Sequence, residues 1–341
     1  MSGGPAATVP DSLARSRALI HRGLQDAVAK LDPSLASVIA FHLGWRDQEG
    51  NEVDQPGGKS VRPTVTLLAA AAVGAPAEDA VPGAVALELV HNFSLVHDDL
   101  MDGDRERRHR PTVWALFGSS EAILAGDALA ALAYAVLLDA GDESGRAAAR
   151  ELTDATLQMI RGQSEDMAFE SRIDVTEDEV LKMCAHKTGA LIACAASLGG
   201  ILGRGTDAQV AALRSFGSHV GIAFQAVDDV LGIWGEPGVT GKPAASDLRQ
   251  HKKTLPVVHA LAAPGPEAGE FAAMLSEGGL TDAELPRALE ILETAGSRQW
   301  CAGVAERHLG RALDALGAVD LAAAPAGELA DIARFVVGRN F

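Results

Sequence analysis

Helix-length apolar segments, separated by short breaks, constrain the fold of this chain more than any other feature. Clusters of Gly, Pro and Asp interrupt the sequence at 47–58, 74–83, 139–145, 203–207, 235–243 and 263–270. No segment between these breaks alternates apolar and polar residues with the period of two that indicates a strand. Aromatic residues make up only 4% of the chain, whereas alanine, the strongest helix former, is abundant. The sequence therefore predicts an all-α protein, with one helical domain over residues 11–341.

The remaining bulk properties exclude several classes of protein. Residues 1–10 are small and rich in Gly and Pro, which is typical of a disordered tail and lacks the apolar core of a signal peptide. No uncharged apolar run reaches the length of a membrane span. The net charge of −17 argues against nucleic acid or an anionic membrane as the main partner. Cys184, Cys194 and Cys301 have no metal-ligand spacing, so we expect free thiols in a cytoplasmic protein without stable membrane insertion.

The stretch HDDLMDGDRERRHRP at residues 97–111 combines aspartates with basic residues. Asp98 and Asp102 are four residues apart, so on a helix they share one face, with Cβ atoms roughly 6 Å apart. Two carboxylates at about 5 Å repel each other by about 3 kcal/mol at an effective dielectric constant of 20. The preceding residues are mostly apolar, so this face is expected to point inward, where a cation must offset the repulsion. The acids therefore indicate a hard-cation site, and Arg107 and Arg108 indicate an anion contact.

The segment GIAFQAVDDVLGIWG at residues 221–235 repeats this arrangement. Asp228 and Asp229 follow an apolar helical run, and the residues after it include Lys242, Asp247 and Lys252. Carboxylate oxygens are the ligands that Mg²⁺ prefers, and Mg²⁺ commonly holds substrate phosphates. Two inward-facing aspartate clusters with basic residues between them therefore predict a diphosphate bridged by Mg²⁺.

With these segments the chain resembles the polyprenyl synthetase family, the trans-prenyl diphosphate synthases, and among them the bacterial geranylgeranyl diphosphate synthases. The resemblance starts at about residue 15 and is carried by GGKSVRP (57–63), HNFSLVHDDLMD (91–102), RRHRPT (107–112), AGDAL (125–129), GQSED (162–166), KTGAL (187–191), AFQAVDD (223–229) and GKPAASDLRQHKKTLP (241–256). It implies an isoprenoid-synthase-type helical bundle around a central active-site cavity. It also implies a homodimeric prenyltransferase that uses Mg²⁺ to condense isopentenyl diphosphate with allylic diphosphates.

The resemblance also assigns roles to individual residues. The expected metal ligands are Asp98, Asp102 and Asp228, and Asp99 and Asp229 are expected to orient these ligands and the metal-bound waters. The expected contacts of the allylic diphosphate are Arg107, Lys187 and Lys242, and Lys252 joins the substrate-binding residues. The expected isopentenyl diphosphate site consists of Lys59, Arg62, His91 and Arg108, and Thr188 and Gln225 line the departing bond. The catalytic set is then Asp98, Asp102, Asp228, Lys187, Arg107, Thr188 and Gln225.

Two positions depart from the family pattern. The second motif usually reads DDxxD, but Gly232 stands at its third aspartate, and His109 stands where the family commonly has glycine. Because the metal contact falls on Asp228, which is present, we expect a Gly232→Asp exchange to change activity only modestly. The change at His109 affects the shape of its loop and adds no charge that the site depends on.

Three alternatives to a geranylgeranyl diphosphate synthase stay open: a farnesyl diphosphate synthase, a class I terpene cyclase on the same fold, and a non-catalytic partner subunit of a heteromeric synthase. A cyclase needs no isopentenyl diphosphate pocket, so the set Lys59, Arg62, His91 and Arg108 argues against it. A silent subunit would be expected to have lost an aspartate motif, yet Asp98, Asp102 and Asp228 are all present.

Product length is predicted from the helix that carries Asp98. Phe93 lies five residues before Asp98, about 7.5 Å along a helix axis, and Ser94 is small. One aromatic residue at the fifth position, with no insertion in the first aspartate motif, resembles synthases that stop at twenty carbons. Leu89 and Val90 lie one turn deeper as a further floor. The sequence therefore predicts geranylgeranyl diphosphate as the main product.

Overall fold

The computed structural model describes residues 11–53, 58, 60–139, 141–235, 245–250, 252–276 and 280–338. Nearly all regular structure in these ranges is helical, which confirms the predicted all-α fold. The exception is a hairpin of two short strands, β1 (Glu106–Arg107) and β2 (Arg110–Pro111), which pair antiparallel directly after the first aspartate cluster.

The helices follow one another through the chain with short connections. In order they are α1 (Asp11–Val28), α2 (Pro33–His42), α3 (Val61–Ala72), η1 (Ala77–Ala80), α4 (Val81–Met101), α5 (Val113–Phe117), α6 (Ser119–Leu138), α7 (Glu143–Glu170), α8 (Glu177–Cys184), η2 (Ala185–Gly189), α9 (Ala190–Leu202), α10 (Asp207–Trp234), α12 (Ser246–Arg249), α13 (Leu255–Ala262), α14 (Pro266–Ser276), α15 (Leu285–Thr294), α16 (Ser297–Gly317) and α17 (Ala323–Val337).

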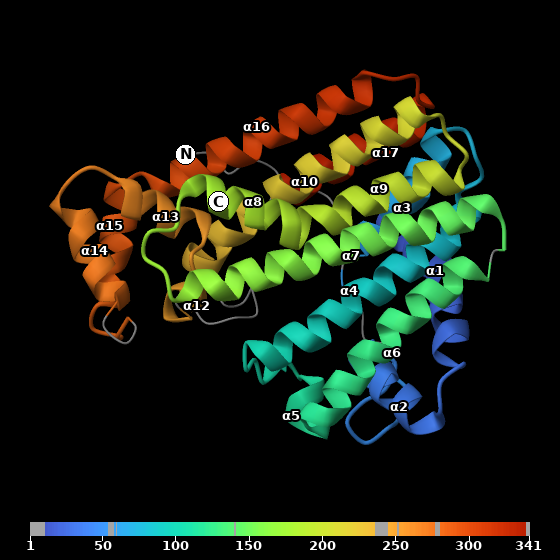
Figure 1. Ribbon diagram of the computed structural model, residues 1–341, viewed down its shortest axis with the longest axis horizontal. Coiled ribbons are helices and arrows are strands. Elements are labelled where there is room, and N and C mark those ends of the chain that lie inside the picture. The colour runs from blue at the N-terminus through green and yellow to red at the C-terminus, as the bar shows by residue number, and fades with distance from the viewer. Residues whose placement is uncertain are drawn as a thin grey trace.

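The long helices α4, α7 and α10 determine where the two aspartate clusters lie. Helix α4 packs against α3 and α6, α9 packs against α3, α7 and α10, and α10 packs against α16. The C-terminal ends of α4, α7 and α10 all point toward the side of the molecule where α12 lies (Figure 1). Residues at the ends of these three helices are therefore brought toward one another although they are far apart in the sequence.

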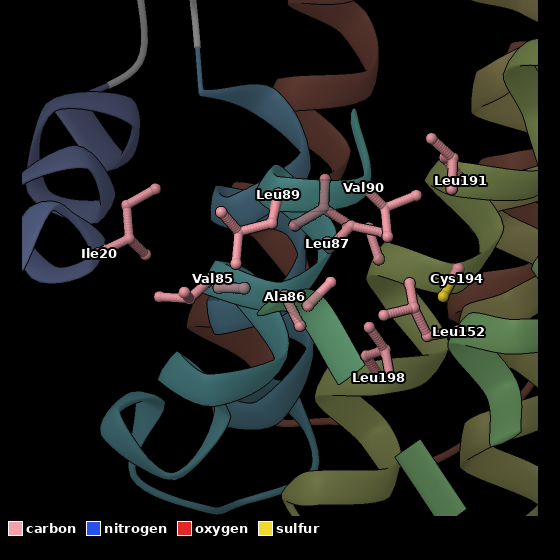
Figure 2. Close-up of a cluster of buried hydrophobic side chains, with 14 of the residues drawn as sticks. Ile20, Val85, Ala86, Leu87, Leu89, Val90, Leu152, Leu191, Cys194 and Leu198 are labelled. Carbon is pink, nitrogen blue, oxygen red and sulfur yellow. The ribbon is translucent and has the colours of Figure 1, made fainter. Parts of the chain in front are cut away.

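The apolar core lies beside α4 and fixes this helix in place. Leu87, Leu89 and Val90 of α4 are fully buried, and the side chain of Leu191 on α9 is only 2% exposed. Val90 is directed toward Leu191, whereas Leu89 lies on the side of α4 that is nearer to α1 (Figure 2). A helix that is apolar on nearly all sides is stable only when it is enclosed. Helix α4 is therefore a rigid support for the aspartates at its C-terminal end.

The cysteines are buried in two apolar clusters and form no disulfide. Cys184, Cys194 and Cys301 are free and buried. Cys194 belongs to the same cluster as Leu191 and Leu198 (Figure 2), so it behaves as a small apolar side chain.

Helix α6 exposes an unusually apolar outer face. Two helical segments are long and apolar enough to cross a membrane by length and composition: α6 and the continuous segment Glu177–Leu202. In the second segment 72% of the most apolar window is buried inside the protein, but in α6 only 39% is. Large apolar side chains are exposed on α6 and the neighbouring α5 and α7: Leu116, Phe117, Ile123, Leu124, Leu138, Leu157, Ile160 and Met167. We call these side chains the α5–α7 apolar face.

Candidate active site

The first aspartate pair lies at the C-terminal end of α4. Asp98 is in the last turn and Asp102 is the C-cap residue, whose backbone N–H donates to the Asp98 carbonyl oxygen at 2.8 Å. Burial raises the pKa of Asp98, Lys187 lowers it, and the like charge of Asp102 raises it again. A net upward shift means that the nearby cations compensate this carboxylate incompletely. The pair is thus suited to an additional cation.

Lys252 connects the first aspartate pair to the segment that follows α10. Its Nζ lies 3.1 Å from Asp102 Oδ2, and both side chains are only 16% exposed. Burial alone would lower the pKa of Lys252, but Asp102 and Asp166 outweigh it and the net shift is upward. Lys252 is therefore held as a cation between the two aspartate clusters.

Asp99 holds the first arginine of the hairpin. Its carboxylate, only 2% exposed, accepts a hydrogen bond from Arg107 Nε at 2.7 Å. Burial raises the pKa of Asp99 to about 6, although Arg107 acts in the opposite direction. Arg108 and His109 form the turn between β1 and β2 and both have positive φ, 53° and 61°. Two-residue hairpin turns commonly need such values at both central positions, so His109 adopts the conformation that glycine takes more readily.

A π-helical turn, η2, places Lys187 and Thr188 on the same site. Lys187 Nζ donates to Asp166 Oδ2 on α7 at 2.5 Å, and His186 Nδ1 lies 2.8 Å from Glu165 Oε2 on the same helix. A Cβ on Gly162 would lie 2.3 Å from the Lys187 backbone nitrogen, so only glycine permits this approach of α7. Single π turns insert one extra residue into a helix and often occur at functional sites.

A hydrogen-bonded chain runs from η2 to the second aspartate cluster. Thr188 Oγ1 donates to Gln225 Oε1 at 2.6 Å, and Gln225 Nε2 donates to Asp229 Oδ1 at 2.7 Å. The other carboxylate oxygen of Asp229 accepts the backbone N–H of Leu255 at 2.9 Å. Asp229 is 3% exposed, and burial raises its pKa to about 7, although these hydrogen bonds lower it. Both carboxylate oxygens of Asp229 are therefore occupied by hydrogen bonds, and its neighbour Asp228 is the partly exposed member of the pair.

A second basic region lies beside the first cluster. Arg62 Nη1 lies 3.2 Å from His91 Nε2, and Arg62 Nε is buried with no hydrogen-bond partner among the described residues. Arg108 lies next to Gly58, where a Cβ would be 3.0 Å from its Nη2. Burial raises the pKa of Glu88, and Arg62 and Arg108 partly offset this shift. The predicted set Arg62, His91 and Arg108 is thus brought together, with unused donors that can bind an anion.

The arginines of the hairpin also border a cavity. It has a volume of about 290 Å³ and is lined by Phe41, His42, Asn92, Leu95, Asp99, Arg107, Arg108, Arg110, Pro111 and Thr112. Three guanidinium groups and one carboxylate face this space, so an anion is electrostatically favoured beside Arg108.

Two predicted residues, Lys59 and Lys242, lie outside the described residues. The neighbours of Lys59 are described: Gly58 faces Arg108, and Ser60 adopts a left-handed conformation with φ of 52° at the start of α3. Within the described ranges, no three His, Cys, Asp or Glu side chains gather closely enough to form a metal cluster. The donor chemistry nevertheless fits Mg²⁺, because Asp98, Asp102 and Asp228 offer only carboxylate oxygens, the ligands that Mg²⁺ prefers.

The residues predicted to set product length lie on different sides of α4. Phe93 is partly buried and meets the ring of His97 edge-on, with 5.0 Å between ring centroids. Ser94 Oγ donates to the His91 carbonyl oxygen at 2.8 Å. Leu89 and Val90 are both fully enclosed by the core. Leu89 and Val90 leave α4 in different directions, Val90 toward Leu191 and Leu89 nearer to α1 (Figure 2).

Sequence reasoning missed several residues that organise the site. Asp166 holds Lys187, Glu165 holds His186, and Glu88 lies next to Arg62. Asp166 and Lys187 are 21 positions apart, so no local pattern joins them. In the sequence, the acidic pair Glu165 and Asp166 in the segment GQSED was the only sign that acids of this helix take part in the site.

Comparisons with known proteins agree with this geometry. The sequence profile of the family described as "Polyprenyl synthetase" matches residues 45–292. A (2E,6E)-farnesyl diphosphate synthase of Mycobacterium tuberculosis is 48% identical over 94% of this chain and 91% of its own length. A geranylgeranyl diphosphate synthase of the same organism is 42% identical over 89% of this chain and 87% of its own. The crystal structure of a polyprenyl synthetase from Streptomyces coelicolor superposes with a TM-score of 0.92 at 46% identity, covering 97% of this chain and all of the other.

The chain folds into an all-helical bundle with aspartates at the ends of two long helices, and it matches these proteins over most of its length. It therefore belongs to the polyprenyl synthetase family. The family predicted from the sequence is thereby confirmed. Within it, the chain is a short-chain trans-prenyl diphosphate synthase, a prenyltransferase with the isoprenoid-synthase fold.

The adjacent aspartates of the second motif should respond differently to removal. In Asp229→Ala, the Leu255 N–H and the Gln225 amide lose their buried acceptor, and each unsatisfied donor costs about 1–3 kcal/mol of unfolding free energy. Asp228→Ala should lower turnover with a much smaller effect on thermal stability. Calorimetry and steady-state kinetics on both variants test this, and equal losses of melting temperature would show that Asp228 is as structural as its neighbour.

Proposed function

We propose that this protein condenses isopentenyl diphosphate with allylic diphosphates in a Mg²⁺-dependent reaction, at the site between α4, η2 and α10. One observation carries the proposal: Asp98 and Asp102 lie close to Lys187 and Lys252 on one side, and Arg62, His91 and Arg108 gather next to them. Two separate basic groups around one acidic pair suit two diphosphates.

The first group would bind the allylic diphosphate. Mg²⁺ held by Asp98, Asp102 and Asp228 would supply positive charge to the leaving diphosphate. Lys187, Lys252 and Arg107 add their own charge from fixed positions, because Asp166, Asp102 and Asp99 hold them. Cations placed before the reaction stabilise charge that develops on the leaving group, so the allylic C–O bond can ionise.

The second group would bind isopentenyl diphosphate and direct its alkene at the cation. Arg62, Arg108 and Lys59, which lies outside the described residues, would hold its diphosphate. The alkene attacks the allylic cation, a new C–C bond forms, and a proton leaves to the released pyrophosphate. No nucleophilic side chain is required. The apolar residues of α4 keep water from the cation, and Thr188 and Gln225 provide the few polar groups near the departing bond.

The assay that tests this function uses the purified protein, isopentenyl diphosphate and each allylic primer, with analysis of product chain length. Asp98→Ala and Asp102→Ala should lower kcat by about two to four orders of magnitude, because the lost contacts act on transition-state charge. An exposed aspartate, Asp314→Ala on α16, serves as the control and should retain wild-type turnover. Near-normal turnover of either active-site variant at saturating Mg²⁺ would contradict the metal assignment.

The two diphosphate sites should separate in steady-state kinetics. Arg108 is exposed, so Arg108→Ala removes a charge-assisted contact without disturbing the core. A hydrogen bond to a charged group contributes about 1.5–3 kcal/mol, so KM for isopentenyl diphosphate should rise about tenfold to a hundredfold. KM for the allylic substrate should stay nearly constant. Equal changes in both constants would refute the division, and a protein that binds no isopentenyl diphosphate would instead fit the cyclase alternative.

For the product we propose geranylgeranyl diphosphate, with farnesyl diphosphate as the second candidate. Phe93 supports the first, because a single aromatic residue precedes Asp98 at this distance and Ser94 leaves the adjacent position open. The 48% identity to a farnesyl diphosphate synthase favours the second.

Phe93→Ala should shift the products toward longer chains, because it removes the aromatic ring that packs against His97. Chain lengths are measured by chromatography after dephosphorylation, with Phe335→Ala on α17, another partly buried phenylalanine of the same core, as a control for nonspecific loosening. Unchanged chain lengths in Phe93→Ala would place the stop elsewhere, and Leu89→Ala and Val90→Ala would then be compared separately.

We further propose a homodimer in the cytoplasm, with residues 11–341 as one domain. The α5–α7 apolar face supports this: helix α6 leaves most of its apolar window uncovered, and a second copy could bury it by two-fold symmetry. A monomer in sedimentation experiments at micromolar concentration would contradict the dimer.

A further inference from the structure

Arg17, an exposed residue of α1, reaches the backbone that leads into α3. Its Nη2 donates to the Gly58 carbonyl oxygen at 2.5 Å, and its Nε lies 3.5 Å from Ser60 Oγ. Gly58 and Ser60 belong to the segment GGKSVRP, which supplies Lys59 and Arg62 to the predicted isopentenyl diphosphate site. None of the segments that carry the family resemblance contains Arg17 itself. A residue from elsewhere in the chain thus holds the backbone beside this site.

Ser60 needs support because of its backbone conformation. It has a φ of 52°, in the left-handed region that residues with a side chain rarely adopt. Such a conformation persists only where surrounding contacts hold it in place. Thr64 of α3 contributes two of these contacts, since its backbone N–H and its Oγ1 donate to the Ser60 carbonyl oxygen at 3.1 and 2.7 Å. Arg17 adds a contact from α1, so two helices fix the start of α3, which carries Arg62.

Gly58 connects this turn to the hairpin that carries Arg108. A Cβ on Gly58 would lie 3.0 Å from Arg108 Nη2, 3.1 Å from its Nη1 and 3.3 Å from its Cζ. These three distances are nearly equal, so the face of the Arg108 guanidinium group lies against the Gly58 backbone. The carbonyl group of Gly58 is also the acceptor for Arg17. Arg17 therefore fixes the surface on which Arg108 rests.

The charges of this region form one cluster around a buried carboxylate. Burial raises the pKa of Glu88, and Arg62, Arg108 and Arg17 all act in the opposite direction. Arg17 thus shares its surroundings with the two arginines that are predicted to bind isopentenyl diphosphate. Its Nη2 and Nε, however, are directed at oxygens of the protein, so these nitrogens hold the backbone and are not directed at an anion.

We propose that Arg17 is a positioning residue for isopentenyl diphosphate. By holding Gly58 and Ser60, it fixes the backbone that leads into α3. The guanidinium groups of Arg62 and Arg108 are then oriented toward one diphosphate before the substrate binds. Donors that are already oriented bind more tightly than donors that must first be ordered. The inference rests on the proposed function, in which Arg62 and Arg108 bind this substrate.

The experiment compares the wild type with Arg17→Ala and Arg17→Lys in the full-length chain. In Arg17→Ala, KM for isopentenyl diphosphate should rise about tenfold, the effect of one lost charge-assisted contact. KM for the allylic substrate and the melting temperature should stay nearly constant, because Arg17 is exposed. Arg17→Lys should show a smaller rise, since lysine keeps the charge but lacks the guanidinium fork that reaches both oxygens.

Arg15→Ala is the matched control. Arg15 is another exposed arginine of α1, and its Nη2 donates to Glu328 Oε2 on α17 at 2.6 Å. It ties α1 to a different part of the protein, so its removal should leave both KM values unchanged. An equal rise in KM for isopentenyl diphosphate in Arg15→Ala would show that any weakening of α1 has this effect, and it would overturn the specific role of Arg17.

A double variant distinguishes positioning from direct binding of the diphosphate. If Arg17 acts by supporting Arg108, the two losses are coupled, and Arg17→Ala should add about threefold or less to the KM of Arg108→Ala. If Arg17 bound the diphosphate itself, the two losses would multiply. Multiplied losses, equal changes in both KM values, or an unchanged KM for isopentenyl diphosphate in Arg17→Ala would overturn the inference.

Binding measured without turnover separates this inference from the proposed function. In isothermal titration calorimetry with isopentenyl diphosphate, the dissociation constant of Arg17→Ala should be about tenfold higher than that of the wild type or of Arg15→Ala. A wild type that binds isopentenyl diphosphate but makes no prenyl product would contradict the proposed function, and the calorimetry would still test Arg17. A wild type that binds no isopentenyl diphosphate would overturn both.

Discussion

The pairing of carboxylates with cations from other helices is the interaction on which the site depends. Asp98 and Asp102 lie at the C-terminal end of α4, where the helix dipole already places negative charge, so further acids are unfavourable there. Lys252 contacts Asp102, and Lys187 lies near Asp98 while it contacts Asp166. Each of these pairs joins segments that are far apart in the chain. The same contacts that stabilise the acids therefore hold the cations where a diphosphate would need them.

Close approach of helix backbones makes these pairings possible. Gly162 allows α7 to contact the Lys187 backbone, and a Cβ on Gly221 would lie only 2.4 Å from the Gly189 Cα. Both glycines border η2, whose extra residue directs Lys187 toward Asp166 and Thr188 toward Gln225. Gly232 acts by the same principle for a side chain, because it leaves room for the Asp247 carboxylate. The glycines of this protein thus control which polar groups can meet.

The apolar core and the polar site share helix α4 but use different parts of it. Leu87, Leu89 and Val90 are enclosed by neighbouring helices (Figure 2), and this enclosure holds the C-terminal turn with Asp98 in a fixed position. Rigid support of this kind suits a reaction in which charge develops on a leaving group, since donors that are already oriented need not reorganise. The outer surface is different: the large apolar side chains of the α5–α7 apolar face are exposed, and the proposed dimer would bury them.

The sequence by itself determined the fold class, the family and the identity of most polar groups in the site. Helix-length apolar segments without strand alternation predict a helical bundle, and the two aspartate motifs with their basic neighbours indicate a metal-bound diphosphate. These signals are local or rest on motifs in order along the chain, so they can be read without coordinates.

Only the tertiary structure decided which groups meet. Asp166 and Lys187 are 21 positions apart and Asp102 and Lys252 are 150 apart, so their pairing depends on how the helices pack. The structure likewise distinguishes Asp228 from Asp229, because only Asp229 is buried and accepts the Leu255 N–H. In the sequence, Gly232 is a missing aspartate. In the structure its lack of a side chain leaves room for the Asp247 carboxylate, a contact that the sequence does not reveal.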